Sequence, residues 1–379
     1  MSSGELNLVS WMREKALPFW AANGVDHRDG GFVEELNQDG SPSSVAHKRV
    51  RVQGRQLYSF ATAALLGWHK DAAAIADHGF AFMKKAYSQK DGHWVRRLTR
   101  DGSILDAQID LYDTAFVVLG LAAYYRLTRN NEALELMKKS LSMVRAKLGT
   151  VPQNGYRQLP NETEVLRQNP HMHWFETMLF CYESTKDTFF LDEAKMVYAL
   201  AENYIIEPKT GALRETFDHQ WKPLREDGKI LVEPGHHYEW AWLLSQAGKV
   251  MTVNPELVSK MVNFADKFGV NPVTRLVYDQ VSDKGMVTQK THRLWAQTEA
   301  IKAWLVRTNV NESDRKMEIQ KIEFNLLHHY FDREPMGSWC DKLDEDGAVH
   351  NGPVPASSMY HILLCVAELS AWRSKEKMK

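Results

Sequence analysis

Histidines recur in this sequence where a polar segment gives way to an apolar helical pattern. Three of them are His173 in NPHMHWFE, His236 in PGHHYEW and His361 in SSMYHILL. Imidazole has an unperturbed pKa of about 6.5, which suits proton transfer near neutral pH. A lone buried histidine is more often structural than functional. The recurrence at equivalent positions, rather than any single histidine, therefore predicts acid–base chemistry.

His236 and Glu239 form the sharpest of these candidate pairs. Residues three apart on a helix are neighbours on its surface, so we expect the carboxylate of Glu239 to lie beside the imidazole. Such a carboxylate fixes the tautomer of the histidine and stabilises its protonated form. An acidic residue near a helix start also stabilises the helix dipole, and the two roles are compatible.

Other polar or aromatic side chains occupy the corresponding positions elsewhere in the chain. They are Arg55 in VQGRQLY, Tyr112 in DLYDTAF, Asn169 in NPHMHWFE and Trp295 in HRLWAQTE. The gaps along the series Arg55, Tyr112, His173, His236, Trp295 and His361 are 57, 61, 63, 59 and 66 residues. A spacing this regular predicts that the six side chains meet if the chain closes on itself.

This set suits the removal of a proton next to a carbonyl group. The reaction needs a base with a pKa near the working pH, and the negative charge of its enediolate intermediate must be stabilised. Arg55 and the N-terminal ends of helices supply positive potential for that purpose. The sequence contains no P-loop, GxGxxG, HExxH or GxSxG motif. We therefore expect no cofactor and no metal. His171 and His173 do not share a helix face, so they are not expected to bind a metal together.

Two other function classes remain open on these residues. A glycoside hydrolase needs two carboxylates across the scissile bond, and Asp113, Glu176 and Glu239 are the candidates for that role. The residue that recurs is histidine, which favours proton transfer instead. The second is a non-catalytic binding protein, which would not require an imidazole–carboxylate pair and an arginine at the same site.

The elements that position these residues follow a six-fold repeat. A turn with glycine, an extended stretch and often Asp-Gly recur, which predicts short β-hairpin loops. The copies begin at Gly30, Asp91, Asn154, Thr210, Thr274 and Met336, at spacings of 61, 63, 56, 64 and 62 residues.

Between the loops the pattern is helical, with two helices per repeat. The expected ranges are 6–22, 51–66, 71–87, 110–127, 131–148, 173–186, 189–204, 238–250, 255–268, 292–307, 313–331 and 357–373. Neither helix of a pair buries its apolar stripe alone, so the pairs must stack. They can form an open solenoid or a closed (α/α)6 barrel. No linker-like segment interrupts the array, which predicts one domain over residues 1–379.

Composition excludes several function classes. Lys and Arg (47) balance Asp and Glu (48), so neither a nucleic-acid groove nor a membrane-binding patch is indicated. The three cysteines are far apart, which favours a reducing compartment over a disulfide framework. The first residues lack the profile of a signal peptide, and no apolar run reaches membrane-spanning length. We therefore expect a cytoplasmic protein; a homodimer is left open.

The motifs VQGRQLYSF, NPHMHWFE, PGHHYEWAWLL, LWAQTEA and VPASSMYHI together resemble the N-acylglucosamine 2-epimerase superfamily over nearly the whole chain. The resemblance implies an all-α (α/α)6 barrel with short β-hairpin loops. It implies that His236 and His361 are the acid–base histidines and that Glu239 is the partner of the first. It also implies that five further residues contact the substrate: Arg55, Tyr112, Asn169, His173 and Trp295.

Within this superfamily the substrate implied by the resemblance is a neutral monosaccharide. In sulfoquinovose isomerase a glutamine stands four residues before the last histidine, whereas Ser357 occupies that position here, which argues against a sulfonated or acidic sugar. Overall motif similarity favours a metal-independent aldose–ketose isomerase that interconverts D-mannose and D-fructose through a cis-enediolate. The alternative is a sugar 2-epimerase of the D-mannose/D-glucose or N-acylglucosamine type.

Overall fold

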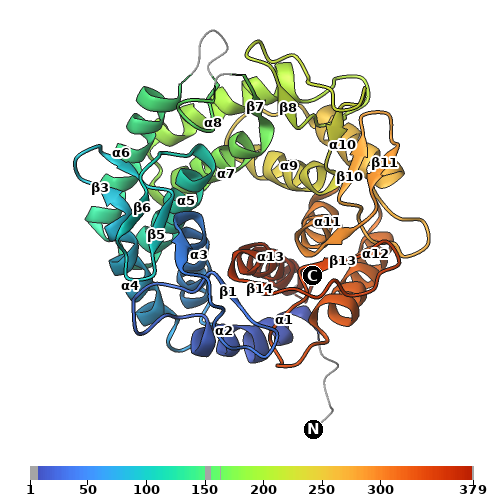
Figure 1. Ribbon diagram of the computed structural model, residues 1–379. Helices are drawn as coiled ribbons and strands as arrows, with labels where there is room; N and C mark the ends of the chain where they lie inside the picture. Colours follow the sequence, from blue (N-terminus) through green and yellow to red (C-terminus); the bar gives the residue numbers. More distant parts are fainter. Residues whose placement is uncertain (1–6, 150–154, 163, 378–379) are drawn as a thin grey trace.

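The computed structural model describes residues 7–149, 155–162 and 164–377, and within this part the chain forms two concentric rings of helices (Figure 1). The inner ring consists of α3 (Val50–Leu65), α5 (Leu111–Thr128), α7 (Gln168–Thr185), α9 (Pro234–Ala247), α11 (Leu294–Val306) and α13 (Met359–Lys377). The outer ring consists of α1 (Leu8–Trp11) and α2 (Leu17–Asn23), joined by a π-helical turn, and of α4 (Ala72–Met83), α6 (Asn131–Leu148), α8 (Thr188–Leu200), α10 (Pro255–Phe268) and α12 (Glu312–Asn325).

The ring is closed. Each inner helix contacts the next one along the chain, and α13 contacts α3, so the last repeat packs against the first. The outer helix α1 also contacts α13. The fold is therefore the all-α (α/α)6 barrel, and the open solenoid is excluded. The first predicted helix begins at residue 6 and the third predicted loop at Asn154, and both of these residues lie outside the described part.

Inner and outer helices differ in how they bury their side chains. The outer helix α10 buries one stripe, which is Leu257, Met261, Val262, Phe264 and Ala265, as expected for a surface helix. The inner helix α5 buries 13 consecutive or nearly consecutive residues between Leu111 and Tyr124, because both of its sides face other elements. Several outer helices begin at an Asn or Asp cap: the side chain of Asn130, for example, accepts a hydrogen bond from the Ala133 N–H at 3.0 Å.

Helices α3 and α5 pack backbone to backbone through two glycines. A Cβ added at Gly54 would lie 2.3 Å from the carbonyl oxygen of Phe116, and one added at Gly120 would lie 2.6 Å from that of Gly54. Glycine is unfavourable inside helices, so this close approach explains its presence in both.

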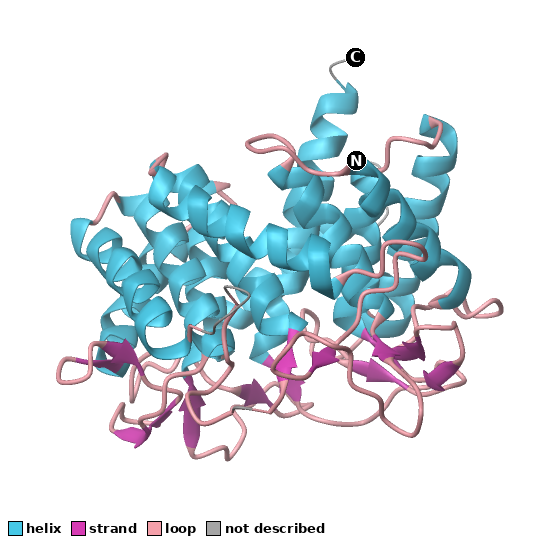
Figure 2. Cartoon of the chain, turned by 90° about the horizontal axis from the view of Figure 1, so that it is seen from above, coloured by secondary structure: helices cyan, strands magenta, loops and turns pink. Residues whose placement is uncertain are grey.

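Short antiparallel strands gather at one end of the barrel, which we call the strand end (Figure 2). The strands are β1 (Glu35–Leu36), β2 (His47–Arg49), β3 (Tyr87–Ser88), β4 (His93–Trp94), β5 (Arg97–Thr99), β6 (Ile104–Asp106), β7 (Leu166–Arg167), β8 (Thr216–Phe217), β9 (Leu231–Val232), β10 (Gln280–Ser282), β11 (Val287–Gln289), β12 (His292–Arg293), β13 (Lys342–Leu343) and β14 (Val354–Pro355). Some pairs are local hairpins, such as β5–β6 and β10–β11. Others join different repeats, and the pairing of β1 with β14 links the first loop to the last.

In four repeats, a buried polar side chain near the start of the inner helix forms a hydrogen bond with the loop that precedes that helix. In each case it accepts a hydrogen bond, of 2.8 or 2.9 Å, from a backbone N–H in that loop. The acceptors are Gln53, His171, His237 and Gln297, and the donors are Phe32, Tyr156, Leu213 and Val277 respectively. The two histidines of this set are therefore structural, and burial lowers the pKa of each to about 4.

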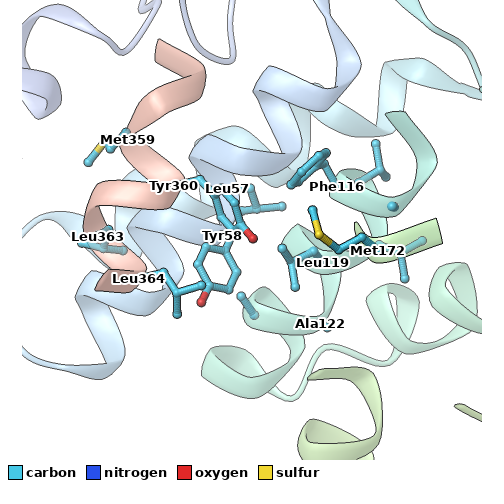
Figure 3. Packing of buried hydrophobic residues seen from close by; sticks show 14 of the residues in the cluster. Leu57, Tyr58, Phe116, Leu119, Ala122, Met172, Met359, Tyr360, Leu363 and Leu364 are labelled. Carbon is cyan, nitrogen blue, oxygen red and sulfur yellow. The ribbon is translucent and has the colours of Figure 1, made fainter. Parts of the chain in front are cut away.

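The apolar core runs between the two rings and into the inner ring. Figure 3 shows Tyr58, Phe116 and Tyr360 among the side chains that fill the space between α13, α3 and α5. No helix of the described part combines the length and the apolar character that a membrane crossing requires.

Candidate active site

The six regularly spaced side chains meet at the strand end of the barrel. Each lies within the first turns of an inner helix, and the inner helices all begin at that end (Figures 1 and 2). The contacts run from one repeat to the next. The ring of Trp295 lies 5.0 Å from that of His236 and 5.6 Å from that of His361. His173 lies 6.4 Å from His361 and 5.2 Å from Tyr112, measured between ring centroids.

Arg55 completes this arrangement on α3. Its Nη2 donates a hydrogen bond of 2.8 Å to the hydroxyl of Tyr112, and its Nη1 donates one of 3.3 Å to the backbone carbonyl of Ser357. The guanidinium also lies 3.8 Å above the ring of Phe116. Arg55 is 7% exposed and makes no ion pair with a carboxylate within the described residues. Its charge is therefore available to a negatively charged reaction intermediate.

His361 is held by a carboxylate from the neighbouring helix α11. Its Nδ1 donates a hydrogen bond of 2.9 Å to Oε1 of Glu299, which has no exposed surface. This bond fixes the tautomer, so that Nε2 is the nitrogen with a lone pair for a substrate. Burial lowers the pKa of His361 well below its usual value, and the charges of Arg55 and Lys302 lower it further. His361 is therefore neutral at neutral pH and able to act as a base.

His236 has the opposite environment. Its Nδ1 lies 3.0 Å from Oε1 of Glu215 and 3.9 Å from Oε2 of Glu233. Burial alone would lower the pKa of His236, but these two carboxylates outweigh it and raise the pKa to about 9. Gln168 donates a hydrogen bond of 2.8 Å to the other oxygen of Glu215 and so fixes that carboxylate. His236 is therefore a cation at neutral pH and able to act as an acid.

The predicted direct contact between His236 and Glu239 is wrong, although the charge of Glu239 still contributes to the raised pKa of His236. Side chains on a helix lean toward its N-terminus, so the imidazole of His236 turns back toward the loop that carries Glu215 and Glu233. Glu239 lies one turn further along α9, where Oε1 is 3.9 Å from Nδ1 of His173. Its carboxyl oxygens accept no hydrogen bond from the described residues, although the side chain is almost fully buried.

Glu239 belongs to a buried group of three carboxyl groups beneath the histidines. The other two are Glu176 on α7 and Glu299 on α11, and all three are at most 4% exposed. Burial and the neighbouring Glu299 raise the pKa of Glu239 well above its usual value. Burial raises the pKa of Glu299 to about 7, against the opposing charge of Lys302. The environment of Glu239 therefore favours the protonated form of its carboxyl group more than an exposed position would.

His173 and Tyr360 connect this group to the strand end. Nδ1 of His173 donates a hydrogen bond of 3.0 Å to Oε2 of Glu176, and the hydroxyl of Tyr360 donates to the other oxygen. Burial by itself would raise the pKa of Glu176, but the hydrogen bonds from His173 and Tyr360 and the charge of Lys302 outweigh it and lower the pKa overall. Burial lowers the pKa of His173 to about 4, so this histidine is a neutral contact rather than an acid.

Trp295 and Asn169 supply contacts of two further kinds. Trp295 lies between His236 and His361 with its ring partly exposed, a position that suits contact with the apolar face of a ligand. Gly235 makes room for it, because a Cβ at Gly235 would lie 2.6 Å from the indole. The carbonyl oxygen of the Asn169 side chain is buried and accepts no hydrogen bond from the residues described.

Three groups in the described part have the ligand types of a metal centre. They are His173 with Glu176 and Glu239, Glu215 with Glu233 and His236, and Glu239 with Glu299 and His361, each with its ligand atoms within 4.8 Å of one another. In each group Nδ1 of the histidine already lies 2.9 to 3.0 Å from a carboxylate oxygen. A proton between these atoms explains the distances, and the arrangement therefore suits proton transfer.

Sequence reasoning missed the carboxylates that hold the histidines. Glu299 lies within the LWAQTEA motif, four residues after Trp295, so its position on the inner face of α11 was readable from the helical period. Glu215 lies 21 residues before His236 in a loop, and only the folded loop brings the two together. His171, by contrast, bonds the backbone of Tyr156 and Arg167 and does not join His173, as expected from their spacing.

Comparison with known proteins shows the same architecture in sugar-converting enzymes. The family profile of N-acylglucosamine 2-epimerase (GlcNAc 2-epimerase) matches residues 30–365. A mannose-6-phosphate isomerase from Rhizobium meliloti (strain 1021) is 32% identical over 97% of this chain and 97% of its own length. A cellobiose 2-epimerase from Dictyoglomus turgidum is 23% identical over 88% of this chain and 89% of its own length. A crystal structure of a D-mannose isomerase superposes with a TM-score of 0.86 at 20% identity, covering 98% of this chain and 99% of that one.

The profile covers most of the chain, and the Rhizobium relative exceeds 30% identity along nearly its whole length. The glycoside hydrolase and the non-catalytic binding protein are thereby excluded. The chain belongs to the N-acylglucosamine 2-epimerase family and is an enzyme, a sugar isomerase or epimerase.

Proposed function

We propose that the enzyme is an aldose–ketose isomerase that interconverts D-mannose and D-fructose through a cis-enediolate. The observation that carries the proposal is the pair of buried histidines on either side of Trp295, whose surroundings push their proton affinities in opposite directions. Groups with separated pKa values divide acid and base roles between them.

In the forward reaction Nε2 of His361 takes the proton from C2 of the open-chain aldose. The C–H electrons form the C1–C2 double bond, and the carbonyl oxygen O1 accepts a proton from cationic His236. His236 then takes the proton of the O2 hydroxyl while His361 returns its proton to C1. The product is the ketose, and both histidines regain their starting charges. Arg55 and Tyr112 stabilise the negative charge that develops on O1 and then on O2, the enediolate character of the reaction, while these protons are in transfer.

The charges at the strand end favour a sugar without a phosphate group. Apart from Arg55, which faces the reacting carbons, three arginines near the starts of the inner helices are already paired with carboxylates. These pairs are Arg51 with Asp113, Arg96 with Asp110, and Arg293 with Glu233. A phosphate carries about two negative charges at neutral pH and is bound by cations that are free to reach it. We therefore infer a neutral hexose as substrate, even though one relative is named for a phosphorylated sugar.

The experiment is incubation of the purified enzyme with D-mannose, D-glucose and D-mannose 6-phosphate, in D2O, followed by sugar analysis. Fructose from mannose, with deuterium entering the product, supports the proposal. A new aldose without ketose assigns the alternative 2-epimerase activity, in which the proton returns to C2. If D-mannose 6-phosphate is the only one of the three sugars that is converted, the inference of a neutral substrate is wrong.

A further inference from the structure

We propose that Lys302 is a positioning residue for the proton transfer of the proposed function: its buried ammonium group holds Glu299, and Glu299 in turn orients His361. The proposal rests on the proposed function for its kinetic consequences. Lys302 itself lies too deep for a substrate contact, since its side chain has no exposed surface.

The geometry is a three-membered chain of charge, carboxylate and imidazole. Nζ of Lys302 lies 2.6 Å from Oε2 of Glu299, one turn earlier on α11. The other carboxylate oxygen, Oε1, accepts the hydrogen bond from Nδ1 of His361 at 2.9 Å. Oε1 is fixed by a hydrogen bond and Oε2 by the attraction of the ammonium charge, without a hydrogen bond of its own; the two contacts together restrict the carboxylate and, through it, the imidazole.

Lys302 also stands among the buried carboxyl groups from other helices. Glu239 on α9 lies with Glu299 and His361 in one cluster of ligand atoms within 4.8 Å, and Glu239 lies with Glu176 and His173 of α7 in another. The ammonium also lies 4.2 Å from the centroid of the Trp242 ring. Burial alone would lower the pKa of Lys302, but Glu299, Glu239 and Glu176 outweigh it and keep the ammonium charged.

The titratable groups around Lys302, Glu299 and His361 come from α3, α7, α9 and α13. They are Arg55 on α3, His173 and Glu176 on α7, His236 and Glu239 on α9, and Tyr360, His361 and Cys365 on α13. The positive charge of the Lys302 ammonium opposes protonation of His361. Loss of that charge therefore makes the Glu299–His361 pair take up a proton at a higher pH.

Stability alone does not account for Lys302. Replacing a buried ion pair by apolar side chains of similar volume is often neutral or stabilising, so such a pair is weak evidence for a purely structural role. The placement of this pair directly behind a catalytic imidazole gives it a kinetic role instead.

The test compares K302M with wild type and with K48M. Lys48 is a matched control, because it forms a similarly buried ion pair with Asp26 at 3.0 Å. Within the described residues it does not contact His236 or His361. We expect K302M to lower kcat at pH 7 by about tenfold or more and to move the acid limb of kcat/KM upward by about one pH unit or more. We expect K48M to leave the acid limb unchanged. A folded K302M with a wild-type acid limb overturns the proposal.

A second measurement applies if K302M does not fold. Nitrogen-15 NMR of histidine-labelled wild type and K302R, with His361 assigned from H361A, reports the tautomer and charge of that ring. We expect a neutral Nδ1–H imidazole at neutral and alkaline pH in both, because both retain the cation. An ordinary titration near pH 6.5 overturns the proposal. This measurement needs no substrate, so it separates a failure of the Lys302 proposal from a wild type that converts no hexose.

Discussion

The substitution E215Q tests the assignment of His236 as the acid. Glu215 is the largest favourable influence on the charge of His236, whose pKa is raised from 6.5 to about 9 against the effect of burial. That elevation corresponds to roughly 3 kcal/mol of preference for the charged ring. Removing one neighbouring carboxylate charge lowers a histidine pKa by about 1 to 3 units. The pKa of His236 should therefore fall to between about 6 and 8, with Glu233 still 3.9 Å away.

The kinetic consequence is a shift of the alkaline limb of the rate profile. Wild type should keep its acid protonated up to about pH 9, whereas E215Q should lose kcat/KM at a pH lower by 1 to 3 units. The assay is the conversion of D-mannose to ketose from pH 5 to pH 10. E226Q is the matched control, because Glu226 is exposed in the same loop region and does not contact His236. An unchanged alkaline limb in E215Q would refute the reasoning.

The same pair contributes to stability with a defined sign. A histidine whose pKa is raised in the folded state adds stability that is fully present below its unfolded pKa, about 6.5, and is lost as the pH rises through its folded value. For His236 that window is pH 6.5 to about 9. The free energy of unfolding of E215Q, measured by denaturant titration, should therefore differ from wild type more at pH 6 than at pH 10.

Three further predictions follow from the site. H361A should abolish turnover and, in D2O, exchange of the C2 hydrogen of mannose, while its circular dichroism stays that of wild type; exchange at the wild-type rate would show that His361 is not the base. E239Q should keep the fold and reduce kcat by less than tenfold, because glutamine mimics the neutral acid that burial favours at Glu239; a collapse of activity would mean that its ionised form is needed. Dialysis against EDTA should leave the rate unchanged, since His173, His236 and His361 each already share a proton with a carboxylate; restoration by one divalent metal after loss would contradict this.

The sequence by itself determined the periodic parts of this protein. The helical period and the turn residues are local properties, so the predicted ranges 131–148 and 255–268 coincide with α6 and α10. Others shift at their N-termini: α7 begins at Gln168 rather than 173, because its polar first turn carries little apolar signal. The regular spacing of Arg55 through His361 also placed these side chains correctly at one end, since each repeat is built alike.

Only the tertiary structure decided which groups act on one another. The spacing of His236 and Glu239 on one helix predicted a pair, but ring closure and the loop before α9 bring Glu215 to His236 instead. Likewise Glu299 and Lys302 reach His361 across the interface between α11 and α13. Charge interactions depend on distance and burial, and both are set by contacts between segments far apart in the sequence. A local pattern therefore shows which residues are capable of the chemistry, and the closed ring determines which charged groups surround each histidine.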